Sequence, residues 1–395
     1  MSLTFLHTAD WQIGKPYARI LDEQKRVLAR QERLQAIQRL GAVAHERHAQ
    51  FIIVAGDLFD STTPDKATVS AACAAMGALK VPVFVIPGNH DHGGPGSLWE
   101  QTFFLQECAA LAPNLRVLLK PEPVELEHAV LLPCPLLRRH DSSDTTAWLR
   151  SVDTHGFGDK PRIVIAHGSV QDFGPVADDE EDFASSNHLD LSRLPGGEFD
   201  YIALGDWHGM KDVSVTTGGK LPAWYSGTPE PDRFPRGVGN TPGHVLVVSL
   251  GRNQPALIEP VKTARLGWHE LEFHFTEDEA VSRLDEALNG MFQGRTGQDL
   301  LRLTLSGSLG IAAWARLDLC LETWRSRLLR LRLHSSVTTA PTEAEMSALV
   351  SRTDAPLTAR VAERLLQETL SPDAEVSETA RQGLRVLFGA LNGTA

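Results

Sequence analysis

Five short apolar runs of this chain end in, or run directly into, side chains able to bind metal ions. The runs span residues 3–8, 51–55, 83–86, 162–166 and 201–204. Short apolar runs bounded by glycine, proline and aspartate predict buried strands. Amphipathic segments between them show apolar residues at three-to-four spacing, which is typical of helices. The order of the elements therefore predicts an α/β fold.

The polar residues at the ends of these runs are expected to share one location. Strand ends placed side by side in a sheet bring their loops to the same edge. Carboxylates, an amide oxygen and several imidazoles at one edge suit a pair of divalent metal ions acting on a phosphoester. The residues are Asp10, Gln12, Asp57, Asp60, Asn89, His90, His167, Asp206 and His208. The pattern predicts a dinuclear metal phosphoesterase.

Composition narrows the setting of the protein. No run of 18 or more apolar residues and no secretory signal pattern occurs, so we expect no membrane segment. The four cysteines are scattered without paired spacing, which favours free thiols in a reducing cytoplasm. A net charge of −12 disfavours a free-standing nucleic-acid binder. Bound metal ions or a partner subunit would offset that charge.

The amino-acid sequences of these motifs resemble those of a known enzyme family. The blocks GDLFD and GNHD, in this order and with the other strand-end motifs, resemble the calcineurin-like metallophosphoesterases. The longer stretches FLHTADWQIG, IPGNHD, YIALGDWHG and WYSGTPEPDRF are similar to the SbcD-type DNA repair exonucleases. Those enzymes are the nuclease half of complexes with an SMC-like ATPase of the SbcC type. The similarity covers roughly the first 260 residues well, and the remainder only in general layout.

The resemblance implies an architecture and a set of partners. The expected fold is two mixed β-sheets packed face to face and flanked by helices, with a small α+β cap and a helical C-terminal tail. The expected domains are 1–261 for the nuclease, 262–336 for a DNA-contacting cap and 337–395 for an ATPase-binding tail. DNA, the ATPase and a second copy of the chain are the expected partners.

The cap is also visible in the local pattern. Residues 266–275, 300–305 and 328–333 alternate like strands, whereas 276–288 and 312–324 have helical spacing. The most basic stretch of the chain lies at the end of this region and consists of Arg325, Arg327, Arg330 and Arg332. Two interpretations stay open for these arginines: contact with the phosphate backbone of DNA, or a solvated strand edge.

The tail after Pro341 is predicted to be helical throughout, with apolar stripes at helical spacing. Such stripes either pack on the protein itself or dock on a partner helix. The resemblance favours docking on the coiled-coil base of the ATPase.

The resemblance further implies a role for each residue of the cluster. Asp57 should bridge the two ions, because a carboxylate offers two oxygens and a charge. One ion is expected on Asp10, Asp57 and His208 with Gln12 alongside, and the other on Asp57, Asn89 and His167 with Asp206 alongside.

Two of these positions depart from the family pattern. Gln12 and Asp206 stand where the family has histidines. The amide oxygen of Gln12 is a weaker ligand than imidazole toward Zn²⁺, whereas Asp206 supplies a hard anionic oxygen. The expected cofactors are therefore two divalent ions, Mn²⁺ first and Mg²⁺ as the alternative, with the Gln12 site the weaker.

His90 is the expected catalytic residue for the leaving group. It directly follows the ligand Asn89, so it can face the substrate and bind the phosphate or protonate the departing oxygen. Asp60 matches the position that orients this histidine in related phosphatases, although it could instead cap a turn.

Three functions are compatible with these patterns. The first is a DNA exonuclease subunit that works with the ATPase. The second is a small-molecule phosphodiesterase or phosphatase, which would have no need for residues 262–395. The third is a weakly catalytic scaffold, which the presence of Asp57, Asn89 and His90 disfavours.

Overall fold

The computed structural model describes residues 3–170, 187–234, 239–339, 345, 347, 350–351 and 355–391. The chain forms two compact units, Met1–Leu266 and Gly267–Ala395, each with a hydrophobic core of its own. Within the described ranges, no helix is both long and apolar enough to cross a membrane.

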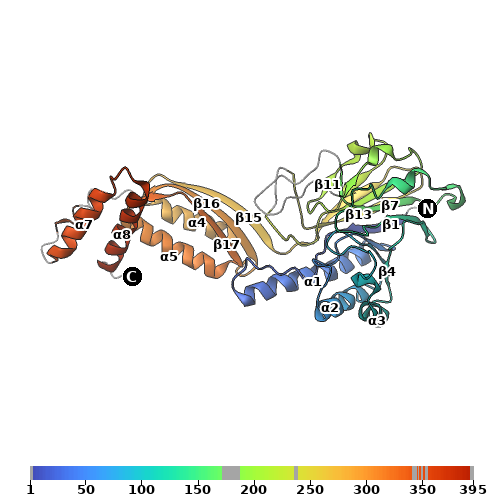
Figure 1. The fold of residues 1–395 in the computed structure, drawn as a ribbon, viewed down its shortest axis with the longest axis horizontal. Helices are drawn as coiled ribbons and strands as arrows, with labels where there is room; N and C mark the ends of the chain where they lie inside the picture. Colours follow the sequence, from blue (N-terminus) through green and yellow to red (C-terminus); the bar gives the residue numbers. More distant parts are fainter. Residues whose placement is uncertain are drawn as a thin grey trace. The chain divides into compact units, whose positions relative to one another are not determined.

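The first sheet of the first unit has the strand order β14-β13-β1-β2-β3-β4. Figure 1 labels its strands β1, β4 and β13. Neighbours from β1 to β4 run parallel, whereas β13 and β14 are antiparallel to their neighbours. The central strands are almost wholly buried, as parallel strands covered on both faces should be. The strands are β1 (Leu3–Thr8), β2 (Ile52–Ala55), β3 (Val83–Ile86), β4 (Leu115–Val117), β13 (His244–Leu250) and β14 (Leu257–Lys262).

The second sheet has the order β11-β12-β10-β7-β6-β5, with parallel pairing from β12 to β6 and antiparallel strands at both edges. Its strands are β5 (Val124–Glu125), β6 (Val130–Cys134), β7 (Arg162–His167), β10 (Tyr201–Gly205), β11 (Lys211–Asp212) and β12 (Ala223–Tyr225). A separate parallel pair joins β8 (Ser169–Val170) to β9 (His188–Leu189).

Helices cover the outer face of the first sheet. They are α1 (Glu23–Glu46), α2 (Lys66–Gly77) and α3 (Thr102–Leu111). The first two begin after aspartates whose carboxylates accept backbone amides of the first turn, at 3.1 Å for Asp22 and 2.7 Å for Asp65. Short 3₁₀ helices span Leu98–Glu100, Ala147–Arg150, His155–Phe157, Leu191–Arg193 and Ser214–Thr217.

The two sheets pack face to face around an aromatic core. Phe5 of β1 stacks on Phe51 with ring centroids 5.2 Å apart, and meets Tyr201 of β10 edge-on at 5.8 Å. Ile53 and Ile163 from the two sheets complete the same buried cluster. These contacts confirm the predicted α/β fold with two mixed, helix-flanked sheets.

The second unit is built on parallel strands in the order β15-β16-β17, with β18 also paired to β16. Its elements are β15 (Gly267–Phe275), α4 (Ala280–Phe292), β16 (Asp299–Leu309), α5 (Ile311–Arg327), β17 (Arg330–Ser335) and β18 (Thr338–Thr339). Leu301, Leu303 and Leu305 of β16 pack with Leu284 of α4 and Leu317 of α5 in one core. Both helices therefore cover the same face of this sheet.

The opposite face of this sheet carries charged side chains. Glu270, Arg302 and Arg332 are in register on β15, β16 and β17, and they alternate with the core leucines. Arg302 and Glu270 form an ion pair at 3.1 Å, with side chains 32% and 47% exposed. This charged face is thus accessible to solvent, whereas the face under α4 and α5 is buried.

The C-terminal helices α7 (Pro356–Glu368) and α8 (Ala374–Leu391) pack on α5 within the second unit. Ala362 of α7, Leu384 of α8 and Ile311 of α5 form a small buried cluster. Glu345 accepts the backbone amides of Ile311 at 3.1 Å and Ala312 at 2.7 Å, so its carboxylate caps the start of α5.

A buried arginine of α1 ties two loops of the first unit together. Arg33 is 3% exposed. Its guanidinium donates to the carbonyl of Trp11 at 2.7 Å, the carbonyl of Glu230 at 2.9 Å and the hydroxyl of Tyr17 at 3.1 Å. The loop after β1 and the loop after β12 therefore share one anchoring side chain.

Candidate metal centre

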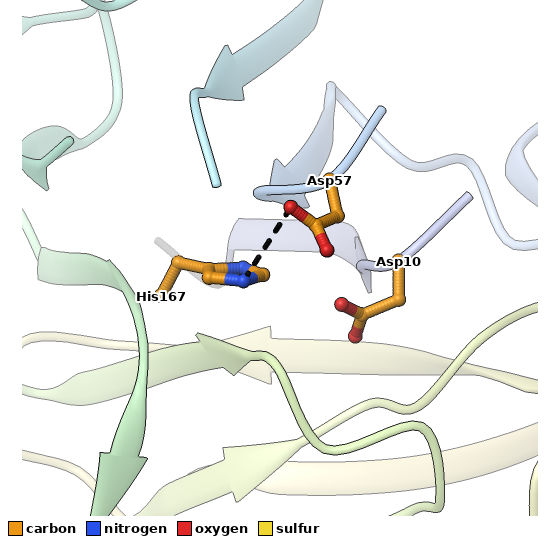
Figure 2. Close-up of side chains that lie close together, drawn as sticks. All are labelled: Asp10, Asp57 and His167. Atoms are coloured by element: carbon orange, nitrogen blue, oxygen red, sulfur yellow. Dashed lines mark ion pairs between the residues drawn. The ribbon is translucent and has the colours of Figure 1, made fainter. Parts of the chain in front are cut away.

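Three buried side chains from the carboxyl ends of neighbouring strands meet in the first unit. Asp10 follows β1, Asp57 follows β2 and His167 ends β7. Figure 2 shows these side chains close together, with an ion pair between His167 and Asp57. One ligand atom from each lies within 4.8 Å of the other two, and the residues are 0%, 1% and 0% exposed. The family resemblance implied that Asp10 shares an ion with His208, whereas the structure also brings its carboxylate close to His167.

The backbone of these loops is bent to present the side chains. Asp10, Gln12, Asp57 and Asp206 have φ angles of 53°, 41°, 54° and 101°, a region that few non-glycine residues adopt. The amide of Asp10 donates to the carbonyl of Gly56 at 3.1 Å, so the first two loops run side by side. A Cβ atom at Gly88 would lie 2.2 Å from Oδ1 of Asp57, hence only glycine fits beside this carboxylate.

The hydrogen bonds of His167 leave one ring nitrogen facing the cluster. Nδ1 lies 2.8 Å from the carbonyl of Ala55, which only accepts, so Nδ1 carries the hydrogen. Nε2 then faces Oδ1 of Asn89 at 2.9 Å, Oδ1 of Asp57 at 3.6 Å and Oδ1 of Asp206 at 3.8 Å. Because three oxygens surround the lone pair of Nε2, a proton or a cation bound there would relieve the repulsion between these atoms.

The pKa directions express the same need for positive charge. Burial and the charges of Asp57 and Asp206 hold the pKa of Asp10 well above its usual value. Burial alone would lower the pKa of His167, but Asp57, Asp10 and Asp206 raise it to about 9. Burial also raises the pKa of Asp206, whereas the charges of His167 and His90 outweigh burial and lower that of Asp57. The donors here fit a divalent cation in place of the His167 proton.

The other side of the predicted centre is arranged differently. His208 lies 2.8 Å through Nδ1 from Oδ1 of Asp232, a carboxylate that fixes the ring. Burial and the charge of Arg233 lower the pKa of His208 to about 4, so the ring is neutral near pH 7. Its Nε2 faces Nε2 of Gln12 at 3.3 Å, and the same amide nitrogen lies 3.5 Å from Oδ2 of Asp57. An amide nitrogen, not an oxygen, points into this half, and that arrangement does not fit a metal ligand.

Lys15 and Asp232 are neighbours of the site that the sequence patterns did not single out. The ammonium of Lys15 donates to Oε1 of Gln12 at 2.9 Å and to Oδ1 of Asp60 at 3.1 Å, and lies 3.1 Å from Oδ2 of Asp232. Lys15 is only three residues from Gln12, and this short spacing could have indicated that their side chains are neighbours. Asp232 lies in the stretch WYSGTPEPDRF, which marked its surroundings as similar to the SbcD-type enzymes, but it is 220 residues from Gln12 and no spacing predicts their proximity.

His90 lies beside the cluster, and its side chain is 26% exposed. Its amide donates to Oδ1 of Asp57 at 2.9 Å, and Nδ1 lies 3.0 Å from the main-chain carbonyl of Asp60. Nε2 is on the side of the cluster, 3.9 Å from Oδ2 of Asp57. Asp60 thus contacts His90 through its backbone, because its carboxylate is engaged by Lys15.

The sequence model of the calcineurin-like phosphoesterase family matches residues 3–223, more than half of the chain. The match includes each strand end that contributes to the centre. The chain belongs to this family. The phosphoesterase is accordingly a metal-dependent hydrolase, and the buried cluster of Asp10, Asp57 and His167 is its candidate metal site.

Solved structures similar to this phosphoesterase include TT1561 of Thermus thermophilus, at 11% sequence identity and a TM-score of 0.38, covering 67% of this chain and 100% of that one. A dimetal phosphatase from Danio rerio matches at 14% identity and a TM-score of 0.34, covering 65% of this chain and 98% of that one.

The four arginines singled out in the sequence lie in the second unit, at the end of α5 and on β17. Arg325 and Arg327 are in the last turn of α5. The guanidinium of Arg327 lies over the ring of Trp324, 5.1 Å from its centroid. Arg330 and Arg332 alternate with the core leucines of β17, so both are on the charged face of the sheet.

Proposed function

We propose that this phosphoesterase hydrolyses phosphodiester bonds of DNA, as the nuclease subunit of a repair complex with an SMC-like ATPase. The buried cluster of Asp10, Asp57 and His167 at the strand ends supports the hydrolysis. The SbcD-like wording of the motifs supports DNA as the substrate. The arginines on the charged face of the second unit support contact with a polyanion.

A bound divalent ion supplies a Lewis acid and lowers the pKa of a water molecule. The ion would be held by the carboxylates of Asp10 and Asp57 and by Nε2 of His167, with the amide oxygen of Asn89 and the carboxylate of Asp206 beside them. Oxygen donors dominate this set, and such sites suit Mn²⁺ or Mg²⁺.

His90 acts on the leaving group in this proposal. The carbonyl of Asp60 accepts a hydrogen bond from Nδ1, which fixes the ring with Nε2 on the side of the cluster. From there Nε2 can hold a proton against the departing oxygen or bind a phosphate oxygen. The ring is 26% exposed, so a substrate can reach it from solvent.

DNA contact is assigned to Arg325, Arg327, Arg330 and Arg332. Guanidinium groups bind phosphate oxygens through paired hydrogen bonds, and these contacts position a duplex without reading its sequence. Arg330 and Arg332 on one sheet face, with the pair of Arg302 and Glu270 beside Arg332, would follow a strand of the backbone.

The ATPase is assigned to the C-terminal helices. Leu357 of α7 is 77% exposed and Val386 of α8 is 73% exposed, so apolar side chains remain on the surface after these helices pack on α5. Such residues can dock against a partner helix. A homodimer and a cytoplasmic location complete the proposal.

The test is degradation of linear and hairpin DNA beside bis-p-nitrophenyl phosphate, with Mn²⁺ and with EDTA. DNA cleavage that requires Mn²⁺ and disappears in Asp57→Asn is expected. Cleavage of the small diester alone would favour a small-molecule phosphodiesterase. Inactivity on both, in a protein that binds metal, would favour a scaffold.

A further inference from the structure

The amide of Gln12 occupies the place where the family has a histidine ligand. Its Nε2 lies 3.3 Å from Nε2 of His208 and 3.5 Å from Oδ2 of Asp57. Its Oε1 lies on the other side, 2.9 Å from the ammonium of Lys15. Gln12 is fully buried, so these contacts are made away from solvent.

The chemistry of the neighbours fixes the orientation of this amide. An ammonium only donates hydrogen bonds and a carboxylate only accepts them. Turning the amide over would place its NH₂ group against Lys15 and its oxygen against Asp57, two repulsive contacts in a buried site. The oxygen that a metal ion would need is therefore held by Lys15.

Lys15 is itself held in place by three acceptors. Its ammonium has three hydrogens, and it lies 2.9 Å from Oε1 of Gln12, 3.1 Å from Oδ1 of Asp60 and 3.1 Å from Oδ2 of Asp232. The Asp232 side chain is 1% exposed. Releasing Lys15 would leave this buried carboxylate without one of its cations, so the arrangement resists rearrangement.

His208 completes the same pattern. Because Nδ1 donates to Asp232, Nε2 presents a lone pair, which is the form that binds a metal. Here that lone pair faces the NH₂ group of Gln12. The amide thus offers one hydrogen toward Asp57 and one toward His208, the two residues that an ion in this position would join.

We propose that Gln12, held by Lys15, takes the place of one of the two metal ions, so that this centre binds a single divalent cation at Asp10, Asp57 and His167. The inference deepens the proposed function, because it concerns the same centre. It replaces the sequence-based expectation of a second, weaker site at Gln12. The Lys15 ammonium supplies a fixed positive charge behind the amide.

The first test counts bound ions in the full-length protein without substrate. Mn²⁺ is titrated by calorimetry and electron paramagnetic resonance is recorded. Wild type should bind one ion and give the six-line spectrum of isolated Mn²⁺. The double variant Gln12→His/Lys15→Met should bind two and give a spin-coupled spectrum. Two ions or none in wild type, or one ion in a folded double variant, would overturn the proposal.

The second test does not depend on the double variant being folded. His208→Ala should change the Mn²⁺ dissociation constant by less than about threefold, because His208 faces Gln12. Loss of a true ligand weakens binding by about tenfold or more, and such a loss would refute the assignment. Asp57→Asn is the matched control that must lose the ion. Absence of DNA cleavage would count against the proposed function and leave the ion count unaffected.

Discussion

The two units use parallel strands in opposite ways. In the first unit the functional side chains stand at the ends of strands. Asp10 and Asp57 have left-handed backbone, and Asp10 and His167 are fully buried. In the second unit the charged side chains stand on the face of the sheet, and Glu270 and Arg302 are 47% and 32% exposed. Burial at strand ends perturbs pKa values and creates demand for a cation. Exposure on a sheet face leaves guanidinium groups accessible, which the proposed contact with a polyanion requires.

Under the proposed function, the first unit carries out hydrolysis and the second unit binds the DNA backbone. A carboxylate needs a low-dielectric site to hold a metal tightly, whereas a guanidinium that binds a phosphate backbone must be reachable. Substitutions in one unit should therefore change turnover, and substitutions in the other should change affinity for long substrates.

The largest expected effect tests the chemical side of the comparison. His90→Gln should lower turnover of both DNA and bis-p-nitrophenyl phosphate by at least about a hundredfold, the usual scale for loss of a general acid. Mn²⁺ content should equal that of wild type, because His90 faces the cluster without completing it. His128→Gln, at an exposed position outside the centre, is the control. Undiminished hydrolysis in His90→Gln would remove this residue from the mechanism.

The binding side is tested on β17. Arg330→Gln/Arg332→Gln should weaken DNA binding by about tenfold and reduce the slope of log affinity against log salt by about one for each phosphate that is no longer neutralised. Turnover of bis-p-nitrophenyl phosphate should not change. Arg283→Gln/Arg364→Gln removes the same charge from exposed helical positions and serves as the control. A parallel loss of small-substrate turnover would break the division between the units.

Stability against pH sharpens the contrast within the first unit. His7 is buried between the sheets, with Nδ1 2.9 Å from the hydroxyl of Tyr201 and Nε2 3.2 Å from the carbonyl of Leu204. Burial lowers its pKa to about 3. As pH falls below the unfolded value of about 6.5, the unfolded chain takes up a proton that the folded protein refuses, so stability is lost.

Lowering the pH from 7 to 5.5 removes about 1 kcal/mol of the stability that the neutral, buried His7 contributes. The free energy of unfolding is measured with urea in the presence of EDTA at both pH values. Over this interval it should fall by about 1 kcal/mol less in His7→Gln than in wild type. The control is His128→Gln, at an exposed position, which should show the same pH dependence as wild type. Equal pH sensitivity of wild type and His7→Gln would contradict a neutral, buried His7.

The smallest effect concerns the second unit. Glu345→Ala removes the carboxylate that accepts the first amides of α5, and should destabilise this unit by about 1 kcal/mol, the usual cost of a lost helix cap. Differential scanning calorimetry should show a lower transition for this unit and an unchanged one for the first. Glu363→Ala, at an exposed position of α7, is the control. A shift in both transitions would show that the units unfold together.

The sequence was most informative where structure is local. Apolar runs located the strands that end at Asp10, Asp57 and His167, and the order of motifs identified the family. Helix α4 was predicted from residue 276 but begins at Ala280. The reason is tertiary, because Asp278 accepts the backbone amide of Gly310 at 2.7 Å and so serves the start of α5.

The contacts that distinguish this centre from the family pattern are not local. Gln12 alone suggested a weaker metal ligand. Its orientation depends on Lys15, which depends in turn on Asp60 and on Asp232 from a loop more than 200 residues away. Contacts of this kind arise from the packing of the two sheets and cannot be predicted from the spacing of residues along the chain.

Arg33 bears on how the centre opens. Its guanidinium joins the carbonyl of Trp11 to that of Glu230, so the loops that carry Gln12 and Asp232 are fastened to one helix. The amide hydrogens of Ile13 and Thr228, bonded to Leu58 and His208, should then exchange with deuterium at a common rate set by one cooperative opening. Neither loop should then open without the other, because both are bonded to the same guanidinium.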